Sequence, residues 1–226
     1  MRIMAIVPAY NEEKSIYSVI SSIKTSRADI DVIVVNDGSA DNTSIEARRA
    51  GAYVIDLPYN LGIGGAVQTG YIYGCKGNYD IVVQIDGDGQ HDPYDLDKLL
   101  APVISGEVDM AIGSRFIETS GYKSSAFRNM GINFFSRVVM DITGRDIRDT
   151  TSGYRAVNKR VIDLFANYYP TDYPEVETIV YAMRKGIRIK EIPVKMKCRT
   201  QGKSSITPMK AIYYMIKVTL ALILQP

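Results

Sequence analysis

The stretch Ile81-Val-Val-Gln-Ile85, followed by Asp86-Gly-Asp88-Gly-Gln90-His91, decides the fold. The first five residues are mostly apolar and β-branched, which is typical of a buried strand. This strand ends in alternating carboxylates, so Asp86 and Asp88 are expected at the carboxyl edge of a sheet, where open α/β sheets bind ligands. Hard divalent cations such as Mg²⁺ or Mn²⁺ prefer oxygen ligands and share them with phosphates. The stretch therefore predicts a metal site, although an acidic turn with two permissive glycines also fits it.

Short β-branched runs alternate with segments of helical spacing through the first half of the chain. The expected strands are Ile3–Val7, Val32–Val35, Tyr53–Ile55, Ile81–Ile85 and Met110–Ile112. The expected helices are Glu12–Thr25, Asn42–Ala50, Leu61–Lys76 and Tyr94–Ile104, with start signals at Asn11, Asn60 and Asp92-Pro93. This alternation predicts an α/β fold with a mostly parallel sheet and helices on both faces.

The second half is less regular, but it contains no linker, internal repeat or low-complexity stretch. Three helices are expected, at Phe127–Ile142, Asn158–Ala166 and Glu175–Lys185. The alternation from Ile187 to Met196 predicts a strand, and Pro193 favours an edge position for it. We therefore expect one domain over residues 1–205.

Residues 206–226 form an apolar tail. The run 206–224 is about as long as the roughly 20 residues needed to span a bilayer, but Lys210 and Lys217 argue against spanning. These lysines are expected to share a helix face with Tyr213 and Tyr214. We expect a C-terminal amphipathic helix at a membrane surface, with snorkelling lysines. A helix packed on the domain or on a partner subunit is the alternative.

The bulk composition excludes several classes of protein. The chain has 226 residues, of which 46% are hydrophobic and 23% charged, as in a soluble globular domain. The net charge of +2 gives no reason to expect nucleic acid as a partner. Two cysteines, Cys75 and Cys198, make no disulfide framework and favour a reducing cytoplasm. The apolar stretch at the N-terminus is too short for a signal peptide. The single histidine, His91, excludes a multi-histidine zinc site.

Three further segments lie at predicted strand ends or helix starts. The segment Val7-Pro-Ala-Tyr10-Asn11-Glu12 predicts an anion-favouring helix start with a ring for stacking a base. After the second strand, Asp37 can accept a hydrogen bond from a nucleobase or a sugar hydroxyl, whereas Asp41 is expected to cap a helix. The segment Asn60-Leu-Gly62-Ile-Gly64-Gly65-Ala66 matches a dinucleotide fingerprint poorly, because it does not follow the first strand. Its glycines are expected to let a helix approach a nucleotide closely. Each segment alone also fits an ordinary loop.

Together, and in this order, these segments resemble the family-2 glycosyltransferases of the GT-A fold, across roughly residues 1–115. Within that family the chain is similar to the dolichol-phosphate mannose synthase and polyprenyl-phosphate sugar transferase branch. The narrower resemblance rests on Asp86–Pro93, Gly113-Ser-Arg115-Phe116, Asp149–Arg155 and Gly202-Lys203-Ser204. It implies a GT-A (Rossmann-like) catalytic domain over 1–205, with a nucleotide-sugar half at 1–115 and an acceptor half at 116–205.

The resemblance also implies roles for the donor-side residues. The base and ribose would be held near the first two strands, Asp86 would lie against the sugar-nucleotide, and Asp88 and Gln90 would hold Mg²⁺ or Mn²⁺ on the diphosphate. Such a cation neutralises charge on the leaving nucleoside diphosphate. The donor-binding residues expected in this way are Pro8, Tyr10, Glu12, Asp37, Asn60, Gly65, Asp86 and Asp88.

Arginines bracket the acceptor half of the chain. Arg115, Arg128 and Arg155 are expected to hold an acceptor phosphate, because a planar guanidinium suits phosphate. Arg148 is expected to be solvated or structural. A lipid phosphate is already ionised near neutral pH, so its attack needs positioning and charge screening rather than a strong base.

A hydroxyl acceptor would instead need a carboxylate base. Relatives that glycosylate hydroxyls often carry a Glu-Asp pair near this point, and here it is replaced by Glu175 and Glu177. Glu175 is a candidate base, a ligand, or an acid favoured by a helix N-terminus. The catalytic candidates are Asp88, Arg115, Arg128 and Glu175.

These expectations combine into a metal-dependent, inverting glycosyltransferase that moves a hexose from a UDP- or GDP-sugar, with UDP favoured, to polyprenyl phosphate for polysaccharide or glycoconjugate synthesis. The alternatives are a transferase acting on a glycan hydroxyl and a non-catalytic nucleotide-sugar-binding subunit of a membrane partner. Many relatives carry two spanning helices after the catalytic domain, whereas this chain stops at Pro226 and resembles the compact members. We expect a cytoplasmic protein, peripheral on the inner face of the cell membrane through 206–224, as a homo-oligomer or with a membrane partner protein.

Overall fold

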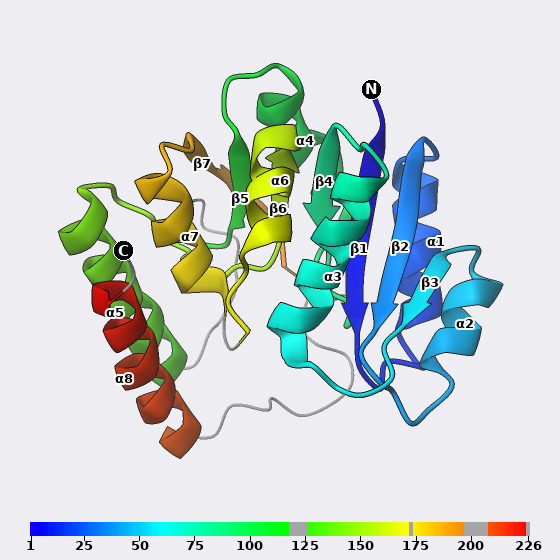
Figure 1. Ribbon diagram of the computed structural model, residues 1–226, viewed down its shortest axis with the longest axis horizontal. Helices are drawn as coiled ribbons and strands as arrows, with labels where there is room; N and C mark the ends of the chain where they lie inside the picture. Colours follow the sequence, from blue (N-terminus) through cyan, green and yellow to red (C-terminus); the bar gives the residue numbers. More distant parts are fainter. Residues whose placement is uncertain (118–125, 172–173, 197–207, 225–226) are drawn as a thin grey trace.

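The computed structural model describes residues 1–117, 126–171, 174–196 and 208–224. Within those residues, seven strands form one sheet in the order β3-β2-β1-β4-β6-β5-β7 (Figure 1). The strands are β1 (Ile3–Ala9), β2 (Ile30–Asn36), β3 (Tyr53–Asp56), β4 (Ile81–Gln84), β5 (Met110–Ser114), β6 (Arg155–Asn158) and β7 (Ile189–Pro193). The chain builds β2 and β3 on one side of β1 and then returns to β4 on the other side, so β1 and β4 flank a topological switch point.

Helices cover both faces of the sheet, because successive strand residues point to opposite faces. Ile3 and Ala5 face a cluster formed with α1, α2 and α4, whereas Met4 and Ile6 face a cluster formed with α3, α5, α6, α7 and α8. The helices are α1 (Ile16–Ser26), α2 (Thr43–Arg49), α3 (Gly62–Lys76), α4 (Leu96–Ile104), α5 (Ala126–Thr143), α6 (Lys159–Asn167), α7 (Pro174–Arg184) and α8 (Pro208–Leu224). A short 3₁₀ turn, Pro93–Asp95, precedes α4. The predicted α/β fold is confirmed.

The sheet is mostly parallel, as predicted, with one exception. Strand β6 runs antiparallel to both of its neighbours, β4 and β5. It was not expected from the sequence, because it is four residues long and begins and ends in polar side chains. Strand β7 pairs in parallel with β5 at the end of the strand order, so Pro193 lies on an edge strand as predicted.

The predicted start of the first helix at Asn11 is wrong, because α1 begins at Ile16. Asn11 adopts a positive φ of 55°, and its side chain accepts a hydrogen bond from the Ala40 N–H at 2.9 Å. The Glu12 N–H donates to Thr43 Oγ1 at 2.8 Å. These contacts hold the segment after β1 against the loop after β2, so it forms part of the carboxyl edge rather than the first turn of a helix.

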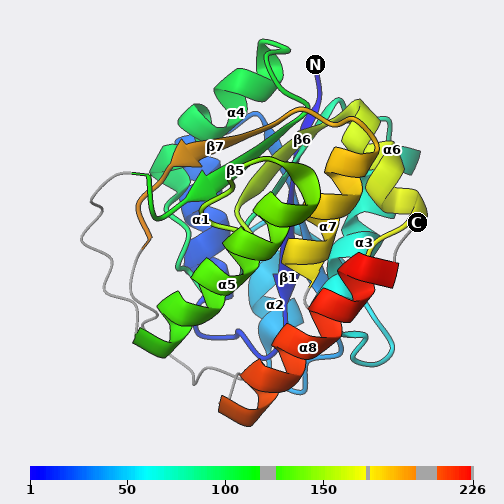
Figure 2. The same ribbon diagram turned by 90° about the vertical axis from the view of Figure 1, so that its left-hand side faces the viewer.

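Helix α8 packs one face on the domain and leaves the other exposed. Tyr214, Val218 and Leu222 are buried against α5 and α7 (Figure 2). The expectation that Tyr214 shares the lysine face is therefore wrong, whereas Lys217 does lie over the ring of Tyr213, 6.0 Å from its centroid. Tyr213, Ile216 and Leu220 form an exposed apolar stripe on α8. None of the described helices is both long and apolar enough to cross a membrane.

An ion pair joins three strands at the amino end of β5. The buried Asp109 carboxylate accepts hydrogen bonds from the Arg188 backbone N–H at 2.9 Å and from the Arg188 guanidinium at 3.1 Å. Asn158 donates to it at 2.9 Å. Arg188, by its hydrogen bonds, lowers the pKa of Asp109 to about 2 from an ordinary 3.8.

Asp109→Asn is expected to lower the free energy of unfolding by about 2 kcal/mol at neutral pH, from the size of this pKa shift. The folded carboxyl has the lower pKa, so its contribution is complete above about pH 5 and is lost as pH falls toward about 2. Urea denaturation of both proteins at pH 7 and pH 3 should show that the difference between their free energies of unfolding is smaller at pH 3. Asp146→Asn, which alters an exposed carboxylate 3.8 Å from Arg148, should leave the free energy of unfolding unchanged at both pH values. A difference in free energy of unfolding that is the same at both pH values would contradict a stabilising role for the ionised Asp109 carboxylate.

Candidate functional site

The carboxyl ends of β1, β2 and β4 surround a cavity of about 300 Å³ beside the topological switch point. Ligands of open α/β sheets bind at this place. The cavity brings together the loops after these strands and the start of α3. Its lining residues are Pro8, Ala9, Tyr10, Glu12, Asp37, Asn60, Gly62, Ile63, Ala66, Asp86, Gly87 and Asp88. All the residues expected on the donor side except Gly65 are therefore neighbours in space.

The lining is strongly acidic. It includes four carboxylates, from Glu12, Asp37, Asp86 and Asp88, and none of its described residues is a lysine or an arginine. Like charges that share a small cavity repel one another and attract cations. An anionic ligand such as a diphosphate would therefore need a bound cation to enter.

Asp37 connects β2 to the start of α3. Its Oδ1 accepts a hydrogen bond from the Leu61 N–H at 2.7 Å, and its backbone carbonyl accepts one from Asn60 Nδ2 at 3.2 Å. At the rim of the cavity, the half-exposed Tyr10 ring offers a face for stacking a planar ligand. The side chain of Ser15 donates to Glu12 Oε2 at 2.7 Å. The hydrogen bonds of Asp37 thus join two loops that are distant in sequence, whereas the bond between Ser15 and Glu12 is local.

Asp86 is surrounded by residues that the sequence reasoning did not place in the site. Its N–H donates to His91 Nδ1 at 3.0 Å, and its Oδ2 lies 3.6 Å from His91 Nε2. A Cβ added to Gly153 would lie 3.2 Å from both carboxylate oxygens. Gly153 belongs to the quoted segment Asp149–Arg155, so the signal was present, but sequence alone does not show that this loop closes on Asp86.

Asp88 and Gln90 form a tight turn after β4. Asp88 Oδ1 accepts the Gln90 N–H at 3.0 Å. Asp88 lines the cavity, whereas Gln90 is not among the lining residues. Within the described part of the chain, no group of three or more Asp, Glu, His or Cys side chains is arranged to hold a metal ion. Because Mg²⁺ is usually bound by one or two carboxylates together with waters and substrate phosphates, the carboxylates of this cavity fit a cation shared with a diphosphate.

The arginines expected on the acceptor side already have protein partners. Arg115, 4% exposed, donates through Nε to Asp149 Oδ2 at 2.7 Å and through Nη2 to the other oxygen. Arg155, 1% exposed, donates to the Ser152 carbonyl, to Thr178 Oγ1 and to the Glu175 carbonyl. Neither lines the cavity, so their binding of an acceptor phosphate stays a prediction.

The remaining residues of the acceptor half that the sequence singled out are Arg128, Arg148 and residues 202–204. The backbone of Arg128 lies in α5, but its side chain falls outside the described part, as do residues 202–204. Arg148 is mostly exposed, as expected.

Glu175 lies in the first turn of α7. Burial raises its pKa, and this effect is opposed by the positive charge of Arg155 and supported by the negative charge of Asp86. Glu175 is therefore placed within electrostatic reach of the acidic cavity, and a raised pKa makes its carboxylate a better proton acceptor than an ordinary glutamate.

Two glycines at the start of α3, Gly64 and Gly65, lie against protein groups, whereas Gly62 lines the cavity. A Cβ at Gly64 would collide with the backbone of Pro170 and Thr171, and the Gly64 N–H donates to the Thr171 carbonyl at 3.2 Å. The space beside Gly65 is taken by the Leu61 side chain. The expectation that this glycine cluster approaches a nucleotide is corrected for Gly64, because the nearest backbone is that of the protein.

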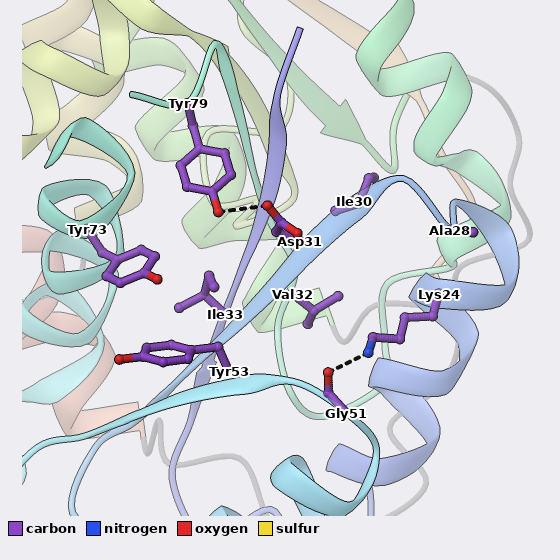
Figure 3. Close-up of a pocket in the computed structure, with 10 residues that line it drawn as sticks. All are labelled: Lys24, Ala28, Ile30, Asp31, Val32, Ile33, Gly51, Tyr53, Tyr73 and Tyr79. Carbon is purple, nitrogen blue, oxygen red and sulfur yellow. Dashed lines mark hydrogen bonds between the residues drawn. The ribbon is translucent and has the colours of Figure 1, made fainter. Parts of the chain in front are cut away.

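A larger hollow of about 480 Å³ lies at the other end of β2 (Figure 3). Two pairs of its lining groups are hydrogen-bonded: the Tyr79 hydroxyl donates to Asp31 at 2.8 Å, and Lys24 donates to the Gly51 carbonyl. It includes none of the motif residues and lies at the amino end of the strands, away from the edge where ligands of such sheets bind.

Comparison with known proteins extends these observations. Residues 4–165 match the family described as Glycosyl transferase family 2. An uncharacterized protein of Methanocaldococcus jannaschii is 33% identical over 95% of this chain and 90% of its own length. The polyprenol monophosphomannose synthase of Mycolicibacterium smegmatis is 28% identical over 96% and 85%. The undecaprenyl-phosphate mannosyltransferase of Micrococcus luteus is 30% identical over 92% and 88%.

Solved structures confirm the fold. Glucosyl-3-phosphoglycerate synthase from Mycobacterium tuberculosis, in complex with Mn²⁺, UDP and glucosyl-3-phosphoglycerate, superposes with a TM-score of 0.74 at 22% identity. The alignment covers 98% of this chain and 78% of that one. With the family match over most of its length and the acidic carboxyl edge in place, the chain belongs to glycosyl transferase family 2 and is a glycosyltransferase of the GT-A fold.

Proposed function

We propose that this glycosyltransferase is metal-dependent and inverting, and moves a hexose from a UDP- or GDP-sugar to polyprenyl phosphate. The acidic cavity at the switch point supports the nucleotide-sugar donor and the metal dependence, because its carboxylates would repel a nucleoside diphosphate that has no bound cation. The acceptor half is supported by relatives named for polyprenol and undecaprenyl-phosphate mannose transfer. UDP is favoured because a protein of the same fold holds UDP and Mn²⁺.

The residues of the cavity take distinct roles in this proposal. Tyr10 stacks the base, Asp37 accepts a hydrogen bond from base or ribose, and Asp86 lies against the sugar-nucleotide. Asp88, together with Gln90, would hold Mg²⁺ or Mn²⁺. When bound, the cation neutralises negative charge on the diphosphate leaving group.

The acceptor decides whether the protein needs a base. A phosphate oxygen attacks as an anion, so Arg128 and the other acceptor-side arginines would position it and screen its charge. A second candidate function, transfer to a glycan hydroxyl, is favoured by the raised pKa of Glu175. Glu175→Gln would abolish transfer to a hydroxyl and leave transfer to a lipid phosphate largely intact.

Donor screening tests the proposal. The purified protein is incubated with Mn²⁺ or Mg²⁺ and a panel of UDP- and GDP-sugars, with and without undecaprenyl phosphate in detergent, and released nucleoside diphosphate is recorded. Release from one donor that requires the lipid supports the proposal and names the sugar. Release that is indifferent to the lipid but stimulated by soluble glycans moves the acceptor to a hydroxyl. No release from any donor contradicts the proposal.

We also place the protein in the cytoplasm, on the inner face of the membrane, through the exposed stripe of α8. Deleting the tail would expose the core, because the opposite face of α8 is buried. Ile216→Glu is the sharper change, since this side chain is 58% exposed. It is expected to weaken binding to phosphatidylglycerol vesicles about tenfold in a flotation assay, because burying an aliphatic side chain contributes about 1.5–3 kcal/mol.

The matched control for this prediction is Ile45→Glu, where the isoleucine is 63% exposed. It belongs to α2, which lies on the opposite side of the molecule from α8 (Figure 1). The Ile45→Glu variant should bind vesicles like the wild type. Both variants should keep the wild-type melting temperature. Equal vesicle binding by the two variants would contradict the role of α8 at the membrane.

A further inference from the structure

His91 is the one histidine of the chain, and it is 3% exposed. Its Nδ1 accepts the hydrogen bond from the Asp86 N–H at 3.0 Å. A neutral imidazole that accepts at Nδ1 carries its proton on Nε2. Nε2 lies 3.6 Å from Oδ2 of the same aspartate. One ring therefore contacts both the backbone and the carboxylate of a single cavity residue.

The ring itself has little freedom to move. It stacks on Tyr154 with centroids 4.7 Å apart and an interplanar angle of 10°. The Tyr154 hydroxyl donates to the Asp92 carbonyl at 3.2 Å, and the backbone of His91 forms a bridge with Met196. The imidazole thus forms a rigid wall behind Asp86.

The charge of the cavity explains why Asp86 needs such a wall. Its side chain is about one-third exposed and shares the cavity with the carboxylates of Glu12, Asp37 and Asp88. Their repulsion favours rotamers that turn Asp86 outward into water, where charges are screened. The proton on Nε2, whose nitrogen is 3.6 Å from Oδ2, attracts the carboxylate and opposes that rotation, while the bond to Nδ1 holds the Asp86 backbone beside the ring.

We propose that His91 is a positioning residue that holds the Asp86 carboxylate in its donor-binding orientation, a role that rests on the proposed function of the cavity. His91 is not among the residues that line the cavity; its Nδ1 accepts the Asp86 N–H and its Nε2 lies 3.6 Å from the Asp86 carboxylate, so it acts through Asp86. Small displacements of positioning groups cost up to about 10²-fold in rate.

A double-mutant cycle tests this role. His91→Phe keeps a ring on Tyr154 but removes both contacts with Asp86, and it is expected to lower kcat/KM for the donor sugar about 10- to 100-fold per folded molecule. In an Asp86→Asn background the same change should cost less than about threefold, because its target is already altered. If the fold-loss in kcat/KM of the double variant equals the product of the two single losses, the residues act independently and the proposal is overturned.

Rescue and binding provide two further readouts. His91→Asn offers an acceptor near the position of Nδ1, so it should recover part of the activity that His91→Phe loses. If kcat/KM across the three proteins instead follows the melting temperature alone, the role of His91 is only structural and the proposal is overturned.

The cycle is also run on the affinity for UDP and GDP, measured by calorimetry with Mn²⁺ without any turnover. Coupling between His91 and Asp86 in this affinity supports the positioning role even if the wild type transfers no sugar, an outcome that would contradict only the proposed function. Additive losses of affinity overturn the positioning role.

Discussion

Asp88→Asn is expected to lower kcat by about 10²- to 10³-fold, the size of effect seen when one charge-stabilising group is removed from an active site. Asp88 lines the acidic cavity and is the carboxylate that would hold the cation. The asparagine amide oxygen can still accept the Gln90 N–H, which Asp88 Oδ1 accepts at 3.0 Å, so the turn should persist. The negative charge is lost, and the affinity of hard cations depends on the charge of their ligands.

Steady-state kinetics over a range of Mn²⁺ concentrations measures this effect, and electron paramagnetic resonance of free Mn²⁺ measures cation affinity directly. Asp97→Asn makes the same change of charge on α4, where Asp97 pairs with Arg27 at the surface, and should leave kcat unchanged. Circular dichroism should show both variants folded. Wild-type kcat in Asp88→Asn would contradict the assignment of the cation to this residue.

The donor side of the site could be predicted because it depends on local patterns. Strands such as Ile81–Gln84 are short, apolar runs, and a loop that follows a parallel strand must emerge at the carboxyl edge. Tyr10, Asp37 and Asp88 follow different strands, and this rule alone brings them together.

The acceptor side depends on contacts between distant segments, which no local pattern encodes. Arg115 and Arg155 were expected to hold an acceptor phosphate because a planar guanidinium suits phosphate. The sequence did not indicate that Asp149, 34 residues after Arg115, accepts hydrogen bonds from its guanidinium. Strand β6 was missed for the same reason, because its pairing with β4 and β5 is set by the sheet rather than by its four residues.

His91 shows the same limit within a motif. It follows Gln90 directly, yet the sequence gives no sign that its ring turns back to Asp86. That orientation depends on Tyr154, which lies in the loop before β6 and stacks on the imidazole ring. Residues that line the cavity could thus be predicted from strand ends, whereas the contacts behind them, such as that of His91 with Asp86, required the tertiary structure.

Arg115→Met is expected to lower the free energy of unfolding by about 3–5 kcal/mol, because it leaves the buried Asp149 without its partner. The Asp149 carboxylate is wholly buried and also accepts the Arg115 backbone N–H at 3.0 Å. The ion pair of Arg115 and Asp149 joins the end of β5 to the loop that carries Gly153. The Asp149 N–H also donates to Glu191 on β7 at 2.7 Å, which ties this loop to a second strand. Loss of the guanidinium should therefore loosen the loop behind Asp86 as well.

Urea denaturation at neutral pH measures this loss. Adding Asp149→Asn to Arg115→Met should recover part of the stability, because it removes the uncompensated charge and keeps an acceptor for the backbone N–H. Arg148→Met, at an exposed arginine 3.8 Å from Asp146, should change the free energy of unfolding by less than about 0.5 kcal/mol. If Arg115→Met instead keeps wild-type stability and loses only the lipid dependence of transfer, the guanidinium serves the acceptor phosphate rather than Asp149. The stability and the lipid dependence of this one variant thus decide whether Arg115 maintains the loop or binds the acceptor.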